Sequence, residues 1–279
     1  MTYESIVKNI DEMPPLSDIV KNMQKLYSRG TDNVNTRELV KLIEADVMLT
    51  ANIFKEINSP YYGFKHKISS ISQAVTLFGI RRIKSFVFQY AMSQQLTVDT
   101  EIYGFNNEQF NDMCILQSSL VMQWFAKIDL RDTDILMPLA LIMESGKLII
   151  AKELYASDYL EEYRKGFLAC DDIVAYEKDF LFTTSYYLSS VLFRHWNFEP
   201  VYADILEAMD ADEKRKQEFD EKIIILSDAL DVIRTAINLK EVLTDESINK
   251  SMQKVYEMGL STSDFKTIAL RVKKAYEQE

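Results

Sequence analysis

Apolar residues recur along most of this chain at spacings of three and four residues, which is the period of an amphipathic α-helix. The first third contains three such stretches, one after Ser17, one after Asp46 and a longer one over residues 80–96. Their apolar positions are Ile19, Val20, Met23, Leu26 and Tyr27; Val47, Leu49, Ile53, Phe54 and Ile57; and Ile80, Ile83, Phe86, Val87 and Tyr90. The pattern predicts helices that each turn one face toward a core.

Polar residues at the ends of these stretches support the same interpretation. Asn35 followed by Glu38, and Ser70 followed by Gln73, have the spacing of a capping box, in which two side chains satisfy amides at the start of a helix. Gly79 is placed to end the helix after Ser70 in a left-handed cap. We therefore expect each helix to have an explicit start or stop in the sequence.

A loop near residues 99–107 separates these helices from a second set. The expected helices of the second set lie near residues 108–128, 133–154, 158–166, 170–180, 183–195, 199–209, 221–238, 246–258 and 263–277. The sequence therefore predicts an all-α protein. Its expected parts are an N-terminal helical lobe over residues 1–107, a second helical lobe over 108–235 and a C-terminal helical extension over 236–279.

Composition agrees with helices and limits the partners. The 279 residues include 7 Gly and 5 Pro, and 47% are hydrophobic. The net charge of −11 disfavours nonspecific binding to nucleic acid or to an anionic membrane. Two short helices with a tight break near residues 36–57 resemble a helix-turn-helix, but the second carries only Lys55 as a base, so we expect no DNA partner.

Other sequence features indicate an intracellular protein. Cys114 and Cys170 are far apart in helical sequence, which favours free thiols over a disulfide framework. The N-terminus lacks the basic start and apolar stretch of a secretion signal, and the longest apolar run, residues 135–143, is too short to cross a bilayer. We therefore expect a cytoplasmic protein without a membrane partner.

The most informative motif precedes the long helix at residues 80–96. Pro60 and Gly63 bracket a turn there, since proline disfavours helix in the preceding residue and glycine tolerates positive φ. The motif is Asn58-Ser59-Pro60-Tyr61-Tyr62-Gly63, followed by Ile68-Ser69-Ser70-Ile71-Ser72-Gln73-Ala74-Val75 and Leu77-Phe78-Gly79-Ile80-Arg81-Arg82-Ile83. It resembles the signature of the HDOD family, the HD-related output domain of bacterial signalling proteins. The resemblance extends from about Met13 to about Asp231 and implies a second lobe similar to the helical HD phosphohydrolase fold.

That resemblance also implies a degenerate metal site. Catalytic HD domains hold metal ions with a first His, an adjacent His-Asp pair and a distal Asp. Alignment on the family pattern Gly-Leu-Leu-His-Asp-Ile-Gly-Lys-Leu puts Met143 at the His and Glu144 at the Asp, and spacing puts a first His on Gln117 and a later one near Ser185. Asp228 alone still matches the distal Asp. A thioether is a poor ligand for these cations, so we expect no metal, no cofactor and no catalytic residue. A magnesium site on Glu144, Asp228 and waters is the alternative.

No other catalytic arrangement is evident. The two histidines are His66, in an apparent loop, and His195, at a helix end beside Trp196, and neither spacing predicts a dyad with a cysteine. Gly146-Lys147 lacks the glycine spacing and the Ser or Thr of a phosphate-binding loop.

A basic stretch of the first lobe is the candidate contact surface. Residues 57–98 contain no Asp or Glu. The candidate partner-binding residues are Tyr61, Tyr62, Lys65, Lys67, Arg81, Arg82 and Lys84. Tyrosine and arginine are typical interface anchors. The alternative is that Tyr61 and Tyr62 are core aromatics and that Asn58 and Gln73 are internal hydrogen-bond partners.

The leading interpretation is a non-catalytic signal-transduction protein that acts through protein-protein contacts. The resemblance implies a bacterial pathway, often one related to motility or cyclic-dinucleotide control. Two alternatives remain, a nucleotide sensor that uses the HD-like pocket and a residual metal-dependent phosphohydrolase.

Overall fold

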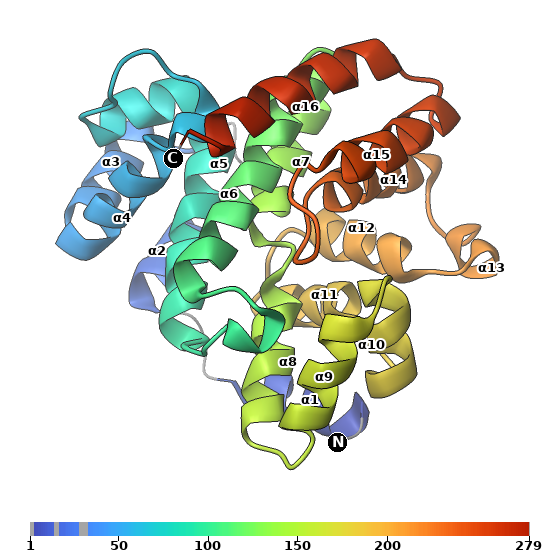
Figure 1. The fold of residues 1–279 in the computed structure, drawn as a ribbon. Coiled ribbons are helices and arrows are strands. Elements are labelled where there is room, and N and C mark those ends of the chain that lie inside the picture. The colour runs from blue at the N-terminus through green and yellow to red at the C-terminus, as the bar shows by residue number, and fades with distance from the viewer. Residues whose placement is uncertain (1–2, 14–16, 28–32, 279) are drawn as a thin grey trace. The chain divides into compact units, whose positions relative to one another are not determined.

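The computed structural model describes residues 3–13, 17–27 and 33–278, and it confirms an all-α fold (Figure 1). Within these ranges the regular elements are helices, and one isolated antiparallel bridge joins Ile237 to Val242. The helices are α1 (Tyr3–Asp11), α2 (Asp18–Tyr27), α3 (Thr36–Glu44), α4 (Val47–Ile57), η2 (Pro60–Tyr62), α5 (Ile71–Gln95), η3 (Glu101–Tyr103), α6 (Asn107–Phe125), α7 (Leu130–Ile142), α8 (Ser145–Tyr155), α9 (Leu160–Ala169), α10 (Ile173–Leu181), α11 (Ser185–His195), α12 (Pro200–Asp210), α13 (Glu213–Lys216), α14 (Glu221–Ala236), α15 (Asp245–Glu257) and α16 (Thr262–Tyr276). No helix of the described ranges combines the length and the apolar character needed to cross a membrane.

The chain forms two compact units, each built from separate segments. The first unit comprises Met1–Pro14, Leu96–Cys114 and Met143–Lys266, and the second comprises Pro15–Gln95, Ile115–Ile142 and Thr267–Glu279. These units differ from the three contiguous parts expected from the sequence. One reason is that α1 packs against α8 and α11 of the first unit, although the chain then passes into the second.

In the second unit, the expected caps start the helices. The Asn35 side chain accepts hydrogen bonds from the amides of Arg37 and Glu38 at the start of α3, and Asp46 caps α4 in the same way. Helix α5 packs against α2, α3, α4 and α7. Gly79 interrupts α5 with φ 80° and ψ 162°, which is a break and not the expected left-handed helical cap.

In the first unit, α8 packs on α11, α11 on α12, α12 on α14, and α14 on α15. The prediction of one helix over residues 133–154 was wrong, because α7 ends at Ile142 and α8 begins at Ser145. The Ser189 hydroxyl explains the break. It donates to the Met143 carbonyl at 2.8 Å and accepts from the Gly146 amide at 2.7 Å, so it satisfies backbone groups that a continuous helix would pair internally.

Candidate functional site

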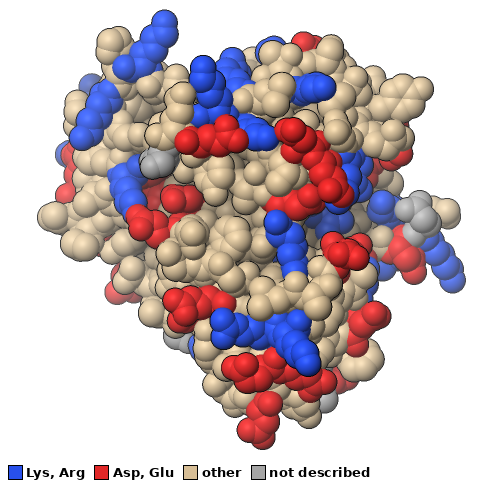
Figure 2. Space-filling model, viewed as in Figure 1, with Lys and Arg blue, Asp and Glu red and all other residues tan. Residues whose placement is uncertain are grey.

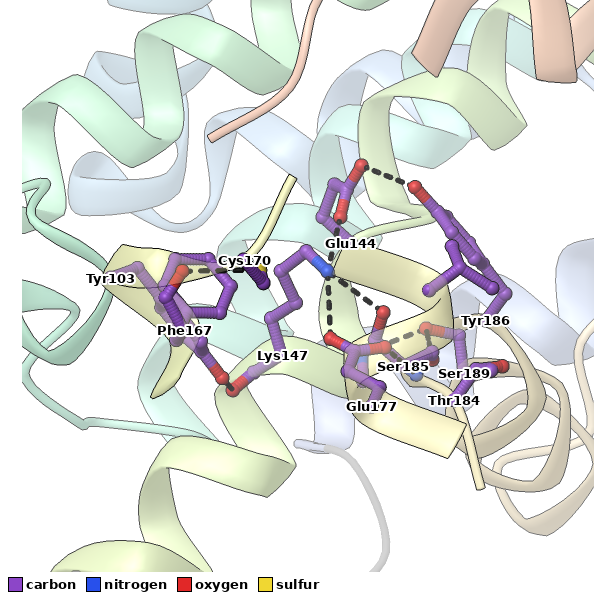
Figure 3. Close-up of polar contacts among 12 residues, drawn as sticks. Tyr103, Glu144, Lys147, Phe167, Cys170, Glu177, Thr184, Ser185, Tyr186 and Ser189 are labelled. Carbon is purple, nitrogen blue, oxygen red and sulfur yellow. Dashed lines mark hydrogen bonds and ion pairs between the residues drawn. The ribbon is translucent and has the colours of Figure 1, made fainter. Parts of the chain in front are cut away.

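A buried lysine occupies the first unit next to the degenerate HD position. The Lys147 ammonium lies 3.0 Å from Glu177 Oε1, 2.9 Å from Ser185 Oγ and 3.6 Å from Glu144 Oε2 (Figure 3). The side chains of Lys147, Glu144 and Glu177 are 2%, 1% and 0% exposed. We call Lys147, Glu144, Glu177, Ser185 and Tyr186 the Lys147 cluster. A buried charge requires such compensation, because an unpaired ion in the interior is strongly destabilising.

The backbone around α8 and α11 places these groups. A Cβ atom added at Gly146 would lie 1.8 Å from the Ser185 carbonyl oxygen, so only glycine permits the two helices to approach this closely. The Ser185 amide donates to Glu177 Oε2 at 2.7 Å, which fixes the second oxygen of that carboxylate. The Tyr103 hydroxyl donates to the Lys147 carbonyl at 2.7 Å. The residue that carries the ammonium is therefore held through both its side chain and its backbone.

Tyr186 connects the cluster to further charges on α14. Its hydroxyl donates to Glu144 Oε1 at 3.2 Å, and the Arg234 guanidinium carbon lies 5.1 Å from the centre of its ring. Asp231 forms ion pairs with both Arg234 and Lys254. The arrangement is a continuous series of buried or half-buried charges running from α8 to α15.

The pKa values follow from this geometry. Burial by itself lowers the pKa of Lys147, but the nearby Glu177 and Glu144 carboxylates outweigh it and raise the pKa above the usual value of a lysine. Burial raises the pKa of Tyr186 well above its ordinary value, and the charge of Glu144 adds to this effect. At neutral pH the cluster therefore holds a protonated lysine and a neutral tyrosine.

The donor set fits a lysine better than a metal ion. Met143 is fully buried and offers a thioether, and the two carboxylates already face the Lys147 ammonium. The structure brings Glu144 and Ser185 to the same ammonium, but Asp228 lies elsewhere, 41% exposed and 3.9 Å from Lys216. Gln117 is buried within α6 of the second unit. No group of three potential His, Cys, Asp or Glu ligands occurs in the described part of the chain.

Sequence reasoning missed Lys147 and Glu177 as members of this site. Lys147 matches the lysine of the HD pattern and follows Gly146, but the sequence predicts no role for it in a site. The signal that identifies it is a lysine three residues after Glu144 within an otherwise apolar stretch, which the structure shows to be buried. No comparable signal marks Glu177, which reaches the cluster only through the packing of α10.

The two histidines have no part in the cluster. His195 lies at the end of α11, and its Nε2 is 3.0 Å from the Met13 carbonyl oxygen. His66 is exposed in the loop between η2 and α5. Both placements match the sequence expectation of a helix-end histidine and a loop histidine.

In the second unit, the signature motif is mainly structural. Tyr61 and Tyr62 are buried, and Tyr62 packs edge-to-face on Phe78 at 5.1 Å. The Tyr61 carbonyl accepts hydrogen bonds from Ser119 and from Gln123 of α6. These two tyrosines are core aromatics in this structure, so a partner would not reach their rings without rearrangement.

Asn58 and Gln73 are internal hydrogen-bond partners, as the alternative interpretation expected. Asn58 Oδ1 accepts from the Ile68 amide at 2.7 Å, and Asn58 Nδ2 donates to the Ile68 carbonyl at 2.9 Å, which closes the loop between them. Gln73 Oε1 accepts from the Ser69 amide while the Gln73 amide donates to Ser70 Oγ. The capping box of α5 is therefore present, with Ser69 in place of Ser70 as the partner of the Gln73 side chain.

The basic candidates separate into paired and exposed residues. Arg82 is 13% exposed and binds Asp134 at 2.9 Å. Lys84 is buried, with its ammonium 4.7 Å from the centre of the Tyr27 ring. Arg81, Lys65 and Lys67 are exposed. Only these last three remain accessible as cations.

Arg81 borders an open groove that the sequence did not predict. The groove has a volume of about 660 Å³, and its lining includes Phe78, Gly79, Arg81 and Arg131. We call it the Gly79 groove. Arg131 is exposed, and neither arginine forms an ion pair with another described residue. Phe64, in the same loop as Lys65 and Lys67, packs against Phe78 at 5.3 Å, which brings this loop beside the groove.

The distribution of charge agrees with this separation. Figure 2 shows Lys and Arg side chains projecting over the loop that joins α4 to α5. Over α9 of the first unit, basic side chains alternate with acidic ones and form no patch of one sign.

Comparison with known proteins identifies a matching family, a related sequence and similar folds. A model of the HDOD domain matches residues 13–211. An uncharacterized protein of Treponema pallidum (strain Nichols) is 27% identical over 92 residues, which are 33% of this chain and only 18% of that protein. The chain thus matches less than a fifth of the length of this curated relative.

Two solved structures are similar over nearly the whole chain. One is an HDOD domain protein with unknown function from Geobacter sulfurreducens, with a TM-score of 0.67, 16% identity and coverage of 98% of this chain and 94% of that one. The other, from Shewanella amazonensis SB2B, bears the name "Putative phosphohydrolase", with a TM-score of 0.72, 15% identity and coverage of 97% and 93%. At these identities the similarity concerns the fold alone.

Proposed function

The chain belongs to the HDOD domain family, as its sequence motif predicted, and on this premise we propose that it is a non-catalytic regulator that acts by binding a protein partner. In this proposal the first unit is a structural support, and the Gly79 groove of the second unit is the contact surface. The pathway in which it acts is a bacterial signalling pathway, as the family resemblance implies.

The Lys147 cluster is the observation that carries the proposal. A hydrolytic metal needs carboxylate and imidazole ligands that are free to bind it. Here the carboxylates of Glu144 and Glu177 both face the single Lys147 ammonium, and the adjacent side chain is a methionine. Since the HD pattern itself has a lysine at the position of Lys147, it is Met143 that disfavours a metal, because it offers a thioether where the pattern has a His. The residues present therefore do not fit the metal, and we derive no hydrolytic step.

The Gly79 groove supports a binding role. The two exposed guanidinium groups of Arg81 and Arg131 line it, together with the Asp134 carboxylate that pairs with Arg82, while Phe78 is buried beneath it. Lys65 and Lys67 lie in the neighbouring loop. Arginine forms paired hydrogen bonds with carboxylates and also offers flat area for packing. The partner that suits this surface is a protein segment with acidic residues.

Affinity capture with charge-reversal variants tests this surface. Arg81→Glu with Arg131→Glu is the test variant, and Lys41→Glu, an exposed lysine of α3 without an ion pair to a described residue, is the control. Arg82 is left intact because its replacement by Glu would face Asp134. We expect a partner that is retained by wild type and by the control but lost by the test variant. If wild type, the control and the test variant capture the partner equally, the Gly79 groove is not the contact surface.

A further inference from the structure

A second cavity, in the first unit, carries charge that the proposed protein contact does not use. It has a volume of about 290 Å³, and it borders the Lys147 cluster through Lys147 and Tyr186. Five cationic side chains and three carboxylates line it, in a protein whose net charge is −11. The cations are Lys147, Arg234, Lys240, Lys250 and Lys254, and the carboxylates are Asp171, Asp172 and Glu241. This excess of cations needs an explanation.

Two of the lining cations share one carboxylate, and Lys240 has no carboxylate partner among the described residues. Arg234 and Lys254 share the single carboxylate of Asp231. Lys240 forms no ion pair with a described residue, and its ammonium donates to the Phe167 carbonyl and lies 5.0 Å from the centre of the Phe167 ring. Lys147 faces Glu144 and Glu177. The three cations Arg234, Lys240 and Lys254 therefore have one carboxylate partner between them, that of Asp231.

Two of the three carboxylates that line the cavity already have partners of their own. Asp172 caps α10 by accepting from the amides of Val174 and Ala175 at 2.8 and 3.0 Å. Glu241 pairs with Lys250 at 3.3 Å. Asp171 is exposed. The carboxylate that opposes an entering anion most directly is therefore that of Asp171.

We propose that this cavity binds the phosphate group of a small ligand, with Arg234, Lys240 and Lys254 as its counter-charges. A guanidinium beside two ammonium groups suits a multiply charged, tetrahedral oxyanion, because charge-assisted hydrogen bonds to phosphate are strong and the planar fork binds two oxygens. Asn238 and Thr235 line the same cavity and offer polar groups to the rest of a ligand. The phosphate belongs either to an inorganic species or to a nucleotide, and the test separates these sources.

Isothermal titration calorimetry with pyrophosphate, AMP and adenosine tests the proposal at constant ionic strength, each ligand taken to about 10 mM so that weak binding is detected. We expect pyrophosphate or AMP to bind and adenosine not to bind. Binding of AMP alone assigns the site to nucleotides, and binding of pyrophosphate assigns it to the phosphate group itself. Failure of both phosphate compounds to bind, or equal binding of adenosine and AMP, overturns the proposal.

Three single variants place the binding in this cavity. Lys240→Gln should weaken binding of the phosphate compound by about tenfold, the effect of one charge-assisted contact. Lys152→Gln, which alters an exposed lysine of α8 outside the cavity, should leave it unchanged. Asp171→Asn should strengthen it, an effect that loss of structure would not produce. Unchanged affinity in both Lys240→Gln and Asp171→Asn overturns the assignment to this cavity. Capture of a protein partner through the Gly79 groove is measured in a separate experiment. The protein-contact proposal and the phosphate proposal can therefore each fail without the other.

Discussion

The Lys147 cluster and the Gly79 groove both gather charged side chains, but the charges face different surroundings. In the cluster, the ammonium and the two carboxylates are at most 2% exposed, and the ammonium forms ion pairs with both carboxylates. In the groove, Arg81 and Arg131 are exposed and form no ion pair among the described residues. Charges that satisfy one another inside a protein hold the fold, whereas exposed charges of one sign remain free for a partner. Variants at the two sites should therefore affect different properties.

The largest effect is expected from breaking the cluster. Lys147→Met removes the buried ammonium that pairs with Glu144 and Glu177, and we expect the free energy of unfolding to fall by about 3–5 kcal/mol. Urea denaturation followed by circular dichroism measures it. Lys152→Met, an exposed position on the same helix, is the matched control and should change stability by less than about 0.5 kcal/mol. A similar small loss in both variants would show that Lys147 does not neutralise the carboxylates.

Gly146→Ala tests the helix contact that builds the cluster. The added Cβ would lie 1.8 Å from the Ser185 carbonyl oxygen, so α8 and α11 must move apart, and we expect a loss of about 3 kcal/mol. Thermal unfolding measures the change. An unchanged midpoint would contradict the close approach of the two helices. Variants of the groove have no such steric consequence.

Alkaline pH tests the protonated lysine. The pKa of Lys147 is raised in the folded protein. Its contribution to stability is therefore complete below the pKa of lysine in the unfolded chain, about 10.4, and is lost as the pH rises through the pKa of Lys147 in the folded protein. We compare wild type with the triple variant Lys147→Met, Glu144→Gln, Glu177→Gln, which lacks the three ionisable groups. Between the unfolded and the folded pKa of Lys147, the free energy of unfolding of wild type should fall by about 1.4 kcal/mol per pH unit more than that of the triple variant. The buried Tyr103 and Tyr186 act in the same direction in both proteins, so parallel pH profiles would contradict the assignment.

The smallest effect is expected in the groove. Arg81→Gln and Arg131→Gln should each change the free energy of unfolding by less than about 0.5 kcal/mol, since both side chains are exposed and pair with no described acid. Arg82→Gln is the informative comparison, because its ion pair with Asp134 should make its loss larger, up to about 1 kcal/mol. Chemical denaturation of the three variants measures the order. A larger loss for Arg81 than for Arg82 would indicate that Arg81 is structural.

The sequence predicted the local features better than the long-range ones. The caps at Asn35 and Asp46 and the turn at Gly63 depend on neighbouring residues, and the structure confirms them. The break between α7 and α8 was missed because it depends on Ser189, 46 residues after Met143. Periodicity cannot report a hydroxyl that arrives from another helix.

In the candidate site, too, the sequence predicted local features better than long-range ones. Alignment on the HD pattern and spacing assigned Glu144 and Ser185 to one degenerate site, and in the structure both lie beside the Lys147 ammonium, where Glu177 joins them only through tertiary packing. Charge along the sequence marked residues 57–98 as basic but did not distinguish buried Lys84 from exposed Arg81. Arg131 lies outside residues 57–98, and no feature of the sequence marked it as part of the same surface. Exposure and pairing decide which cations are available, and both are properties of the fold.

The central claim is that the HD-like position, where Met143 and Glu144 stand in place of the His and the Asp, supports no metal-dependent hydrolysis. The most direct test is hydrolysis of a phosphodiester such as bis(4-nitrophenyl) phosphate, followed in Mn²⁺ or Mg²⁺, with wild type and Glu144→Ala compared. We expect both proteins to give the same rate as buffer containing the metal alone. Metal-dependent turnover by wild type that Glu144→Ala abolishes would contradict the claim and identify the protein as a phosphohydrolase.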